Sequence, residues 1–316
     1  MLYSEMKKNA AGILQSAGIE EYEVDAEYLL QCASGLERNE LFIRWNEEIP
    51  CDLEEKYRAL IDRRKAHEPL QYIIGNQDFM GYTFIVTPDV LIPRFDTEVL
   101  AELAIKRAEQ AYKGMPMDSC GTFRMLDLCT GSGCVAISVG MGFVEKIACS
   151  KDADALRKKI EVIGADISNS ALKVAQRNLE LNWQRMNDVR FSSEDAGLRI
   201  SFSESDLFKS INGKFHIITA NPPYIVRDEI ETLMPEITEH EPHLALDGGE
   251  DGMDFYRKIV CEAPDYLLPG GRLMMEFDDA EAESVAEMME AAGFKDILIH
   301  KDLAGLRRVI EGKIHV

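Results

Sequence analysis

Apolar residues recur at helical spacing through the first 75 residues of the chain. Asp52 and Glu55 match a capping box at a helix start, and the apolar positions beside them are Leu53, Tyr57, Leu60 and Ile61. Their spacing of i, i+4, i+7 and i+8 forms one face of a helix. A second stripe comprises Met6, Ala10, Ile13 and Leu14, and a third helical pattern covers residues 24–30. The pattern predicts a small helical domain over residues 1–75.

The pattern changes at residue 76. Aromatic and β-branched residues lie among Gly81, Pro88 and Pro93, which predicts a β-hairpin and linker over residues 76–96. Seven short apolar runs with strand character follow, at 125–128, 160–165, 200–202, 215–219, 272–277, 297–300 and 306–310. A turn at 269–271 precedes the fifth run, and helical patterns cover 171–181 and 280–292.

Alternating strands and helices predict a parallel α/β sheet with helices on both faces. The last two runs are close enough in sequence to pair as an antiparallel hairpin. This order of elements is typical of a Rossmann-like seven-stranded methyltransferase domain, which we expect over residues 97–316.

The composition is that of a soluble globular protein, with 46% hydrophobic and 29% charged residues among 316. A formal charge of -21 and the lack of a basic patch disfavour a free-standing nucleic-acid binder. The seven cysteines include no CxxC pair, and Pro242 keeps a helix from presenting His240 and His243 together, so we expect no metal site. The acidic glycine loop at 247–251 lacks calcium-loop spacing and is interpreted as a solvated turn. Without a run of ~20 apolar residues or a leader pattern, we expect a cytoplasmic protein with no membrane association.

The first motif with chemical potential runs from Asp127 to Ala136, between a strand and a helix. Gly131 and Gly133 allow a tight turn and close approach to the backbone, and the helix N-terminus offers N–H groups. With Ala136 they also satisfy the loose dinucleotide pattern G-x-G-x-x-A. Asp166 follows the second strand, where an acidic residue accepts hydrogen bonds from ribose hydroxyls. These features predict a cofactor that contains a nucleoside.

The second motif, Asn221-Pro222-Pro223-Tyr224, directly follows the fourth strand. The carboxyl ends of strands in an open sheet face the ligand crevice. Two prolines remove two N–H donors and fix the chain, and Asn221 adds a side-chain acceptor. Such acceptors suit a substrate –NH₂ group, with Tyr224 against the flat group that carries it. Holding both hydrogens favours the positive charge that develops on the nitrogen, so the turn predicts transfer to an amide or amino nitrogen.

Further motifs extend over nearly the whole chain. Residues 68–75 (EPLQYIIG), 90–98 (VLIPRFDTE), 241–257 and 302–309 accompany the NPPY turn. As a set they resemble the PrmC/HemK family of peptide chain release factor N5-glutamine methyltransferases. The resemblance implies methyl transfer from S-adenosylmethionine, with S-adenosylhomocysteine as product. It implies that the acceptor is the side-chain amide of the glutamine in the Gly-Gly-Gln motif of peptide chain release factors.

The resemblance also implies roles for individual residues. The implied cofactor-binding residues are Cys129, Thr130, Gly131, Ser132, Gly133, Asp166, Asp206, Leu207 and Asn221. The implied substrate-binding residues are Asn221, Pro222, Pro223 and Tyr224, of which Asn221, Pro222 and Tyr224 are implied as catalytic. Cys129 stands where the family usually has glycine, and Phe95, His216 and Asp278 are further departures. Stretches 145–159 and 185–198 are longer than usual.

Other functions account for part of these features. A methyltransferase acting on an amino group of adenine or guanine would use NPPY equally well by extruding the base, although the charge of -21 speaks against it. A regulator that binds cofactor without turnover would not need all four NPPY residues, and an NAD oxidoreductase would leave them unused. We expect a monomeric enzyme whose residues 1–75 recognise the release factor, without direct nucleic-acid contact.

Overall fold

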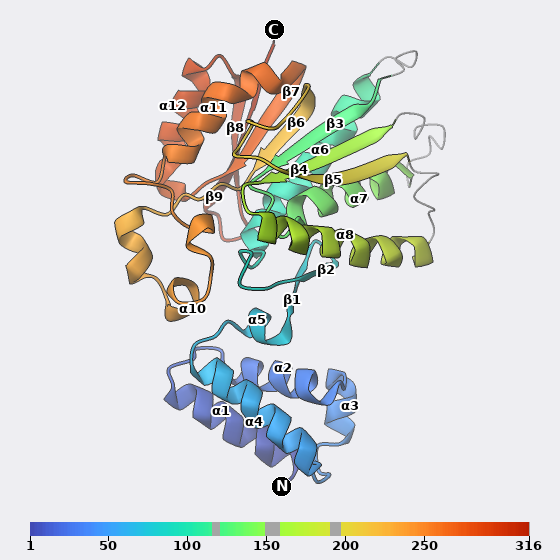
Figure 1. Cartoon of the computed structure of the whole chain (residues 1–316), viewed down its shortest axis with the longest axis vertical. Coiled ribbons are helices and arrows are strands. Elements are labelled where there is room, and N and C mark those ends of the chain that lie inside the picture. The colour runs from blue at the N-terminus through green and yellow to red at the C-terminus, as the bar shows by residue number, and fades with distance from the viewer. Residues whose placement is uncertain (116–120, 149–158, 190–196, 316) are drawn as a thin grey trace. The chain divides into compact units, whose positions relative to one another are not determined.

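A computed structural model describes residues 1–115, 121–148, 159–189 and 197–315. The chain forms two compact units, coloured by residue number in Figure 1. Unit 1 comprises Met1–Asn76 and Leu233–Glu241, and unit 2 comprises Gln77–Thr232 and Pro242–Val316. Parts of the stretches 145–159 and 185–198 lie outside the described residues.

Unit 1 is built from helices. They are α1 (Tyr3–Ser16), α2 (Tyr22–Ser34), α3 (Arg38–Ile43), α4 (Cys51–Lys65), α5 (Leu70–Ile74) and the short α10 (Pro235–Thr238). Apolar side chains from α1, α2 and α4, among them Leu14 and Leu29, form its core. The Tyr57 hydroxyl is buried there and donates a hydrogen bond to the Ala26 carbonyl oxygen at 2.7 Å, so its polar atom is satisfied inside an apolar core.

A buried arginine attaches the segment 233–241 to the rest of unit 1. Arg64 of α4 is 8% exposed, and its Nε donates to Asp25 Oδ2 at 2.7 Å. Its Nη1 donates to Glu236 Oε1 of α10 at 3.0 Å. Because a buried guanidinium is costly unless it is paired, these two carboxylates make its burial possible. The segment therefore belongs structurally to the helical unit, although it is far from residues 1–76 in the sequence.

Two details of the helix prediction are wrong. Helix α4 begins at Cys51 after Pro50, so Asp52 lies inside the first turn and no side chain caps the helix. Pro50 has an extended backbone and lacks an N–H group, which lets the helix start directly after it. Ile13 belongs to the predicted apolar stripe of α1 but is 44% exposed, because its position lies at the edge of the buried face.

Unit 2 contains a seven-stranded sheet. Its strands are β3 (Phe123–Leu128), β4 (Ile160–Asp166), β5 (Leu198–Glu204), β6 (Phe215–Ala220), β7 (Leu267–Glu276), β8 (Lys295–Lys301) and β9 (Arg307–Lys313). Their order is β5-β4-β3-β6-β7-β9-β8, and only β9 runs against its neighbours. The strand order reverses direction at β3, between β4 and β6, which is where open α/β sheets bind ligands.

Helices cover both faces of this sheet. On one face lie α6 (Glu98–Gly114), α7 (Cys134–Ala148) and α8 (Asn169–Val189), and on the other α11 (Asp254–Tyr266) and α12 (Ala282–Ala291). Side chains alternate along β3, so Met125 packs in the first core and Leu126 in the second. The predicted fold class is therefore confirmed.

Shorter elements complete unit 2. Strands β1 (Asn76–Phe79) and β2 (Tyr82–Ile85) form a two-stranded sheet. Short 3₁₀ helices occur at η1 (Phe95–Thr97), η3 (Arg227–Thr232), η4 (His243–Ala245) and η5 (Asp279–Glu281). No helix in the described ranges is both long and apolar enough to cross a bilayer.

The predicted turn at 269–271 is instead an irregularity inside β7. Phe215 is paired with Leu267 and Ile217 with Arg272, so extra residues of β7 are accommodated as a bulge. A Cβ atom on Gly271 would lie 2.8 Å from the Leu268 carbonyl oxygen, which explains a glycine at this position. The strand consequently starts at Leu267 rather than at Arg272.

Candidate active site

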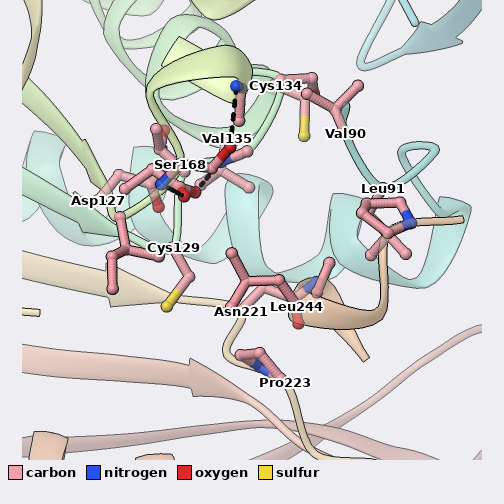
Figure 2. Close-up of a pocket in the computed structure, with 18 of the residues that line it drawn as sticks. Val90, Leu91, Asp127, Cys129, Cys134, Val135, Ser168, Asn221, Pro223 and Leu244 are labelled. Carbon is pink, nitrogen blue, oxygen red and sulfur yellow. Dashed lines mark hydrogen bonds between the residues drawn. The ribbon is translucent and has the colours of Figure 1, made fainter. Parts of the chain in front are cut away.

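A cavity of about 200 Å³ lies in unit 2 at the carboxyl ends of β3, β4, β5 and β6 (Figure 2). The lining residues that follow these four strands are 129–132, 166–168, 205–207, Asn221 and Pro223. The predicted cofactor loop and the predicted substrate turn therefore border the same cavity. Gly133, Pro222 and Tyr224 do not line it.

Two glycines shape the turn after β3 in different ways. Gly131 has a φ of 52°, and a Cβ atom on it would meet no atom within 4 Å, so its backbone borders open space. Gly133 has a φ of 79°, and its Cβ atom would lie 3.1 Å from Ala175 and Phe202. Gly131 thus exposes backbone to a ligand, whereas Gly133 allows close packing beneath the turn.

Cys129 occupies a left-handed backbone conformation with a φ of 55°. A side chain in this region is strained by roughly 1–2 kcal/mol, a cost that glycine avoids. The thiol lines the cavity and packs partly against the second core, and burial raises its pKa. The structure thus accommodates a side chain at the position where the family usually has glycine.

Asp127, the last but one residue of β3, ties the turn to the neighbouring strand. Its Oδ2 accepts a hydrogen bond from Thr130 Oγ1 at 2.6 Å, and its Oδ1 accepts one from Thr219 Oγ1 of β6 at 2.7 Å. Burial raises the pKa of Asp127 to about 6, although both hydroxyls oppose this shift. The carboxylate therefore links the glycine turn to the strand that carries the NPPY turn.

Asp166 ends β4 and faces the cavity. Its Oδ2 accepts from the Gly131 N–H at 2.8 Å and its Oδ1 from the Ser168 N–H at 2.9 Å. Burial raises its pKa, and these backbone donors partly counteract the effect. The Ile167 N–H is a third backbone donor to this carboxylate. The two carboxylate oxygens together have four lone pairs, so Asp166 can still accept from a hydroxyl group of a ligand.

Asp206 and Leu207 lie after β5 on the same cavity. The Asp206 carboxylate pairs with Lys209 Nζ at 2.6 Å at the surface. Leu207 is buried, has a positive φ of 50° and forms part of the cavity wall. The pair thus offers an acceptor beside an apolar face.

The NPPY turn is held rigidly after β6. Asn221 Nδ2 donates to Thr97 Oγ1 at 3.1 Å, while Pro222 and Pro223 are buried and Tyr224 is half-buried. Burial raises the pKa of the Tyr224 hydroxyl, so it stays neutral. A Cβ atom on Gly248 would lie 2.7 Å from the Tyr224 backbone. The acidic glycine loop at 247–251, interpreted from the sequence as a solvated turn, therefore packs partly against NPPY.

Sequence reasoning missed several lining residues. The linker contributes Asp89, Val90, Leu91, Pro93 and Arg94, and the segment after NPPY contributes Pro242, Leu244, Ala245, Phe255 and Lys258. Apart from the family motifs, nothing in the local pattern marks them, because they reach the cavity through tertiary folding.

The sequence prediction also missed Asn178, although a polar residue on an apolar helix face is a recognisable signal. It is fully buried on α8, seven positions after Ala171 on the apolar stripe. Its Nδ2 donates to the carbonyl oxygens of Ser132 and Ile85 at 2.9 and 3.0 Å, and its Oδ1 accepts from the Ile85 N–H at 2.6 Å. A polar residue on an apolar helix face indicates such a bridging role. Here it links the glycine turn to the linker.

The cavity suits a cofactor that contains a nucleoside. Asp166 and Asp206 provide acceptors for hydroxyl or amino groups, and Ile167 and Leu207 provide apolar surface for a flat ring. The open backbone at Gly131 leaves room for a ligand close to the turn. Among the residues with described positions, no group of three His, Cys, Asp or Glu side chains is arranged to hold a metal ion.

Comparisons with known proteins identify the family. Residues 5–75 match the PrmC N-terminal domain. The chain is 38% identical over 307 residues to a release factor glutamine methyltransferase of Geobacter sulfurreducens, covering 96% of this chain and 93% of that protein. It is 33% identical over 319 residues to the protein of the same name from Clostridium botulinum, covering 99% of each.

A solved structure is also similar in part. It is described as a release factor-specific protein-(glutamine-N5) methyltransferase from Alicyclobacillus acidocaldarius, with 26% identity, a TM-score of 0.37, and coverage of 74% of this chain and 100% of that one. The sequence relationships extend over both units and confirm the family predicted from the motifs. This chain belongs to the release factor glutamine methyltransferase family.

Proposed function

We propose that this protein transfers a methyl group from S-adenosylmethionine to the side-chain amide nitrogen of the Gly-Gly-Gln glutamine of a peptide chain release factor. One observation carries the proposal: Asn221 borders the same cavity as Asp166 and the Gly131 turn. A cofactor and an –NH₂ group can therefore meet in one space. The family relationship and the charge of -21 favour a protein substrate over nucleic acid.

The residues divide the work between binding and orientation. When bound, S-adenosylmethionine supplies the methyl group on a sulfonium. Asp166 and the Gly131 backbone would hold its ribose and amino-acid parts, and Asp206 and Leu207 would border its adenine. Asn221 Oδ1 and the carbonyl oxygens of the turn would accept hydrogen bonds from the substrate –NH₂ group.

This arrangement addresses the weakness of the nucleophile. The lone pair of an amide nitrogen is delocalised into its carbonyl group, so the nitrogen attacks poorly. Acceptors fixed around its two hydrogens stabilise the positive charge that grows during attack, and they are already in place before the reaction. Tyr224, neutral and half-buried, would lie against the flat amide. The methylated amide is a strong acid, and its extra proton can leave to water without a dedicated base.

The function is tested by incubating the protein with methyl-labelled cofactor and three separate acceptors: a release factor, RNA and DNA. We expect label only in the release factor, and none when its Gly-Gly-Gln glutamine is replaced by glutamate, because no amide nitrogen remains. Label in a nucleic acid instead would favour the base-methylating alternative. Turnover in the release factor away from this glutamine would overturn the assignment of the acceptor.

Asp166→Ala should weaken cofactor binding by about 1–3 kcal/mol, the usual loss when a buried hydrogen-bonding partner is removed. Calorimetry gives the affinity. Glu204→Ala is a matched control, because Glu204 is the register partner of Asp166 on β5 but is exposed and outside the cavity. Equal affinities for wild type and Asp166→Ala, or tight binding of NAD by the wild type, would contradict the assignment.

Unit 1 would recognise the release factor. Its helix α3 exposes Phe42 and Ile43, which are 76% and 81% exposed, and adjacent apolar residues of this size commonly mark a binding surface. Point substitutions test this better than deletion of residues 1–76, which would strip Glu236 of its partner Arg64.

The double variant Phe42→Ser/Ile43→Ser should raise KM for the intact release factor about tenfold, the loss expected for one apolar anchor. Transfer to a short Gly-Gly-Gln peptide should not change, because the peptide reaches only the cavity. Ile13→Ser, an exposed apolar position on α1, serves as control. An unchanged KM for the intact factor would show that recognition lies elsewhere. We further propose that the protein acts as a cytoplasmic monomer without nucleic-acid or membrane partners.

A further inference from the structure

A buried carboxylate lies beside Asn221 without lining the cavity. Glu276 is the last residue of β7, is 2% exposed and is absent from the cavity wall. Its Oε2 is buried and has no hydrogen-bond partner in the described part of the chain. Because an unpaired buried carboxylate oxygen is costly, a residue of this kind needs an explanation beyond packing.

The Glu276 carboxylate forms side-chain hydrogen bonds with Thr97 and Asn221. Asn221 Nδ2 also donates to Thr97 Oγ1 at 3.1 Å, so the three side chains form one polar cluster. An ionised carboxylate can only accept hydrogen bonds. Asn221 must therefore direct its –NH₂ end toward Thr97 and Glu276, which turns its carbonyl end away from them.

We propose that Glu276 is a positioning residue that fixes the orientation of the Asn221 side-chain amide, so that Oδ1 rather than Nδ2 is offered to the substrate. The inference rests on the proposed function of Asn221 as the acceptor for the substrate –NH₂ group. An inverted Asn221 would present two hydrogens to the two hydrogens of the substrate amide, and the contact would become repulsive. Glu276 acts through Asn221 and does not touch the substrate itself.

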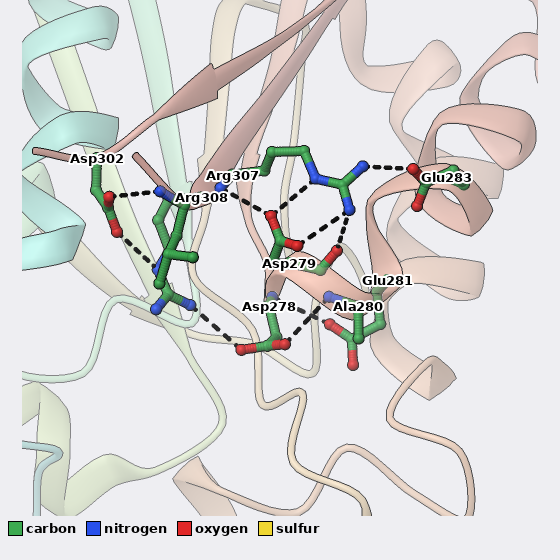
Figure 3. Close-up of polar contacts among 9 residues, drawn as sticks. Asp278, Asp279, Ala280, Glu281, Glu283, Asp302, Arg307 and Arg308 are labelled. Atoms are coloured by element: carbon green, nitrogen blue, oxygen red, sulfur yellow. Dashed lines mark hydrogen bonds and ion pairs between the residues drawn. The ribbon is translucent and has the colours of Figure 1, made fainter. Parts of the chain in front are cut away.

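The strand end that carries Glu276 is held firmly. Asp278 and Asp279, directly after β7, pair with Arg308 and Arg307 of β9 (Figure 3). The Arg308 Nη1–Asp278 Oδ2 distance is 3.2 Å, and Arg307 Nε lies 2.8 Å from Asp279 Oδ1. These ion pairs fix the chain on the carboxyl side of Glu276 and thus the position of its carboxylate.

The orientation of the Asn221 amide should depend on pH, because protonation changes which hydrogen bonds the Glu276 carboxyl group can form. Burial raises its pKa to about 7, an effect that Asp96 reinforces and that Thr97, Arg308 and Asn221 oppose. Among the described residues, Glu276 in turn raises the pKa values of Tyr224, Tyr256 and Cys134. A protonated Glu276 can donate to Asn221 Oδ1, which permits the inverted amide. Methyl transfer should therefore fall as the pH drops through about 7.

The test compares Glu276→Gln with Glu204→Gln at saturating cofactor. Glu276→Gln keeps the shape but is no longer an obligate acceptor, so kcat should fall about 10-fold to 100-fold, as is typical when an orienting partner is lost. Its step in activity near pH 7 should disappear, while cofactor affinity stays unchanged. Glu204→Gln makes the same substitution at an exposed residue outside the cavity and should keep the wild-type kcat and pH profile.

A spectroscopic readout separates this inference from the proposed function. In protein labelled with ¹⁵N-asparagine, the side-chain resonance missing from Asn221→Ala identifies Asn221. It should shift in a step near pH 7 in wild type and not in Glu276→Gln. A pH-independent Asn221 resonance, or Glu276→Gln with normal kcat and pH profile, would overturn the inference. A wild type that shows the step but methylates no release factor would overturn the proposed function instead.

Discussion

Asn221→Ala is expected to lower single-turnover methyl transfer to a Gly-Gly-Gln release factor by about 10²–10³, the usual effect of losing one preorganised polar contact in an active site. The variant removes the acceptor for the substrate –NH₂ group. It leaves Asp166 and the Gly131 turn in place, so S-adenosylmethionine should bind within a few fold of wild type. Rapid-mixing kinetics and calorimetry measure the two quantities on the same preparation.

Asn221→Asp is the matched companion variant. It keeps the size and the acceptors of the side chain but removes the –NH₂ group that Thr97 Oγ1 receives at 3.1 Å. It also places a second carboxylate beside that of Glu276, and two adjacent negative charges repel each other. We expect transfer to fail here too, with cofactor binding retained. Near-normal transfer by Asn221→Ala would show that the NPPY turn is only a scaffold.

Glu311→Ala is expected to lower the free energy of unfolding of unit 2 by about 3–5 kcal/mol, the cost of breaking a buried ion pair by removing one partner. The Glu311 side chain is fully buried at the centre of β9. Arg107 Nε of α6 lies 2.8 Å from its Oε2, and Arg272 Nη1 of β7 lies 3.0 Å from the same atom. His300 Nε2 of β8 lies 2.9 Å from Oε1, so one carboxylate joins a helix and three strands.

The pH dependence of stability provides the check. Burial raises the pKa of Glu311, but bonds from His300 and Arg107 outweigh it and hold the pKa at about 2, below the ordinary 4.5. The contribution to stability is therefore present above pH 4.5 and is lost as the pH falls through about 2. Denaturant unfolding should show wild type and Glu311→Ala converging in acid. Glu54→Ala, which removes an exposed pair with Arg58, should cost at most about 1 kcal/mol at any pH. A difference that persists unchanged into acid would contradict this account.

The framework of the site follows from the sequence because strand ends are local features. Each apolar run of the parallel sheet is followed by its polar residue, and parallel strands bring their carboxyl ends together. Asp166 and Asn221 are thus predictable at the same edge of the sheet, although β3 separates their strands. The bulge in β7 was not predictable in the same way, because Pro269 and the glycines beside it indicate a turn as strongly as a bulge.

The supporting contacts depend on residues far apart in the chain. Thr97, Asn221 and Glu276 meet only because β6 and β7 are paired in the sheet and Thr97 of η1 contacts Asn221 at the end of β6. No spacing in the sequence links the three residues. Leu91 and Leu244 reach the cavity from irregular segments whose path has no periodicity. Where a side chain acts through long-range contacts, local pattern carries little information about it.

The attachment of residues 233–241 to the helical unit has a consequence for synthesis of the protein. The first 76 residues leave the ribosome early, but the carboxylate of Glu236 that pairs with Arg64 is translated much later. At a synthesis rate of about 5–20 residues per second, residues 233–241 follow the first 76 residues after on the order of ten seconds or more. During that interval Arg64 can pair with Asp25 and the Glu68 carbonyl oxygen but not with Glu236. The N-terminal unit is therefore completed only after strands β1 to β6 have been made.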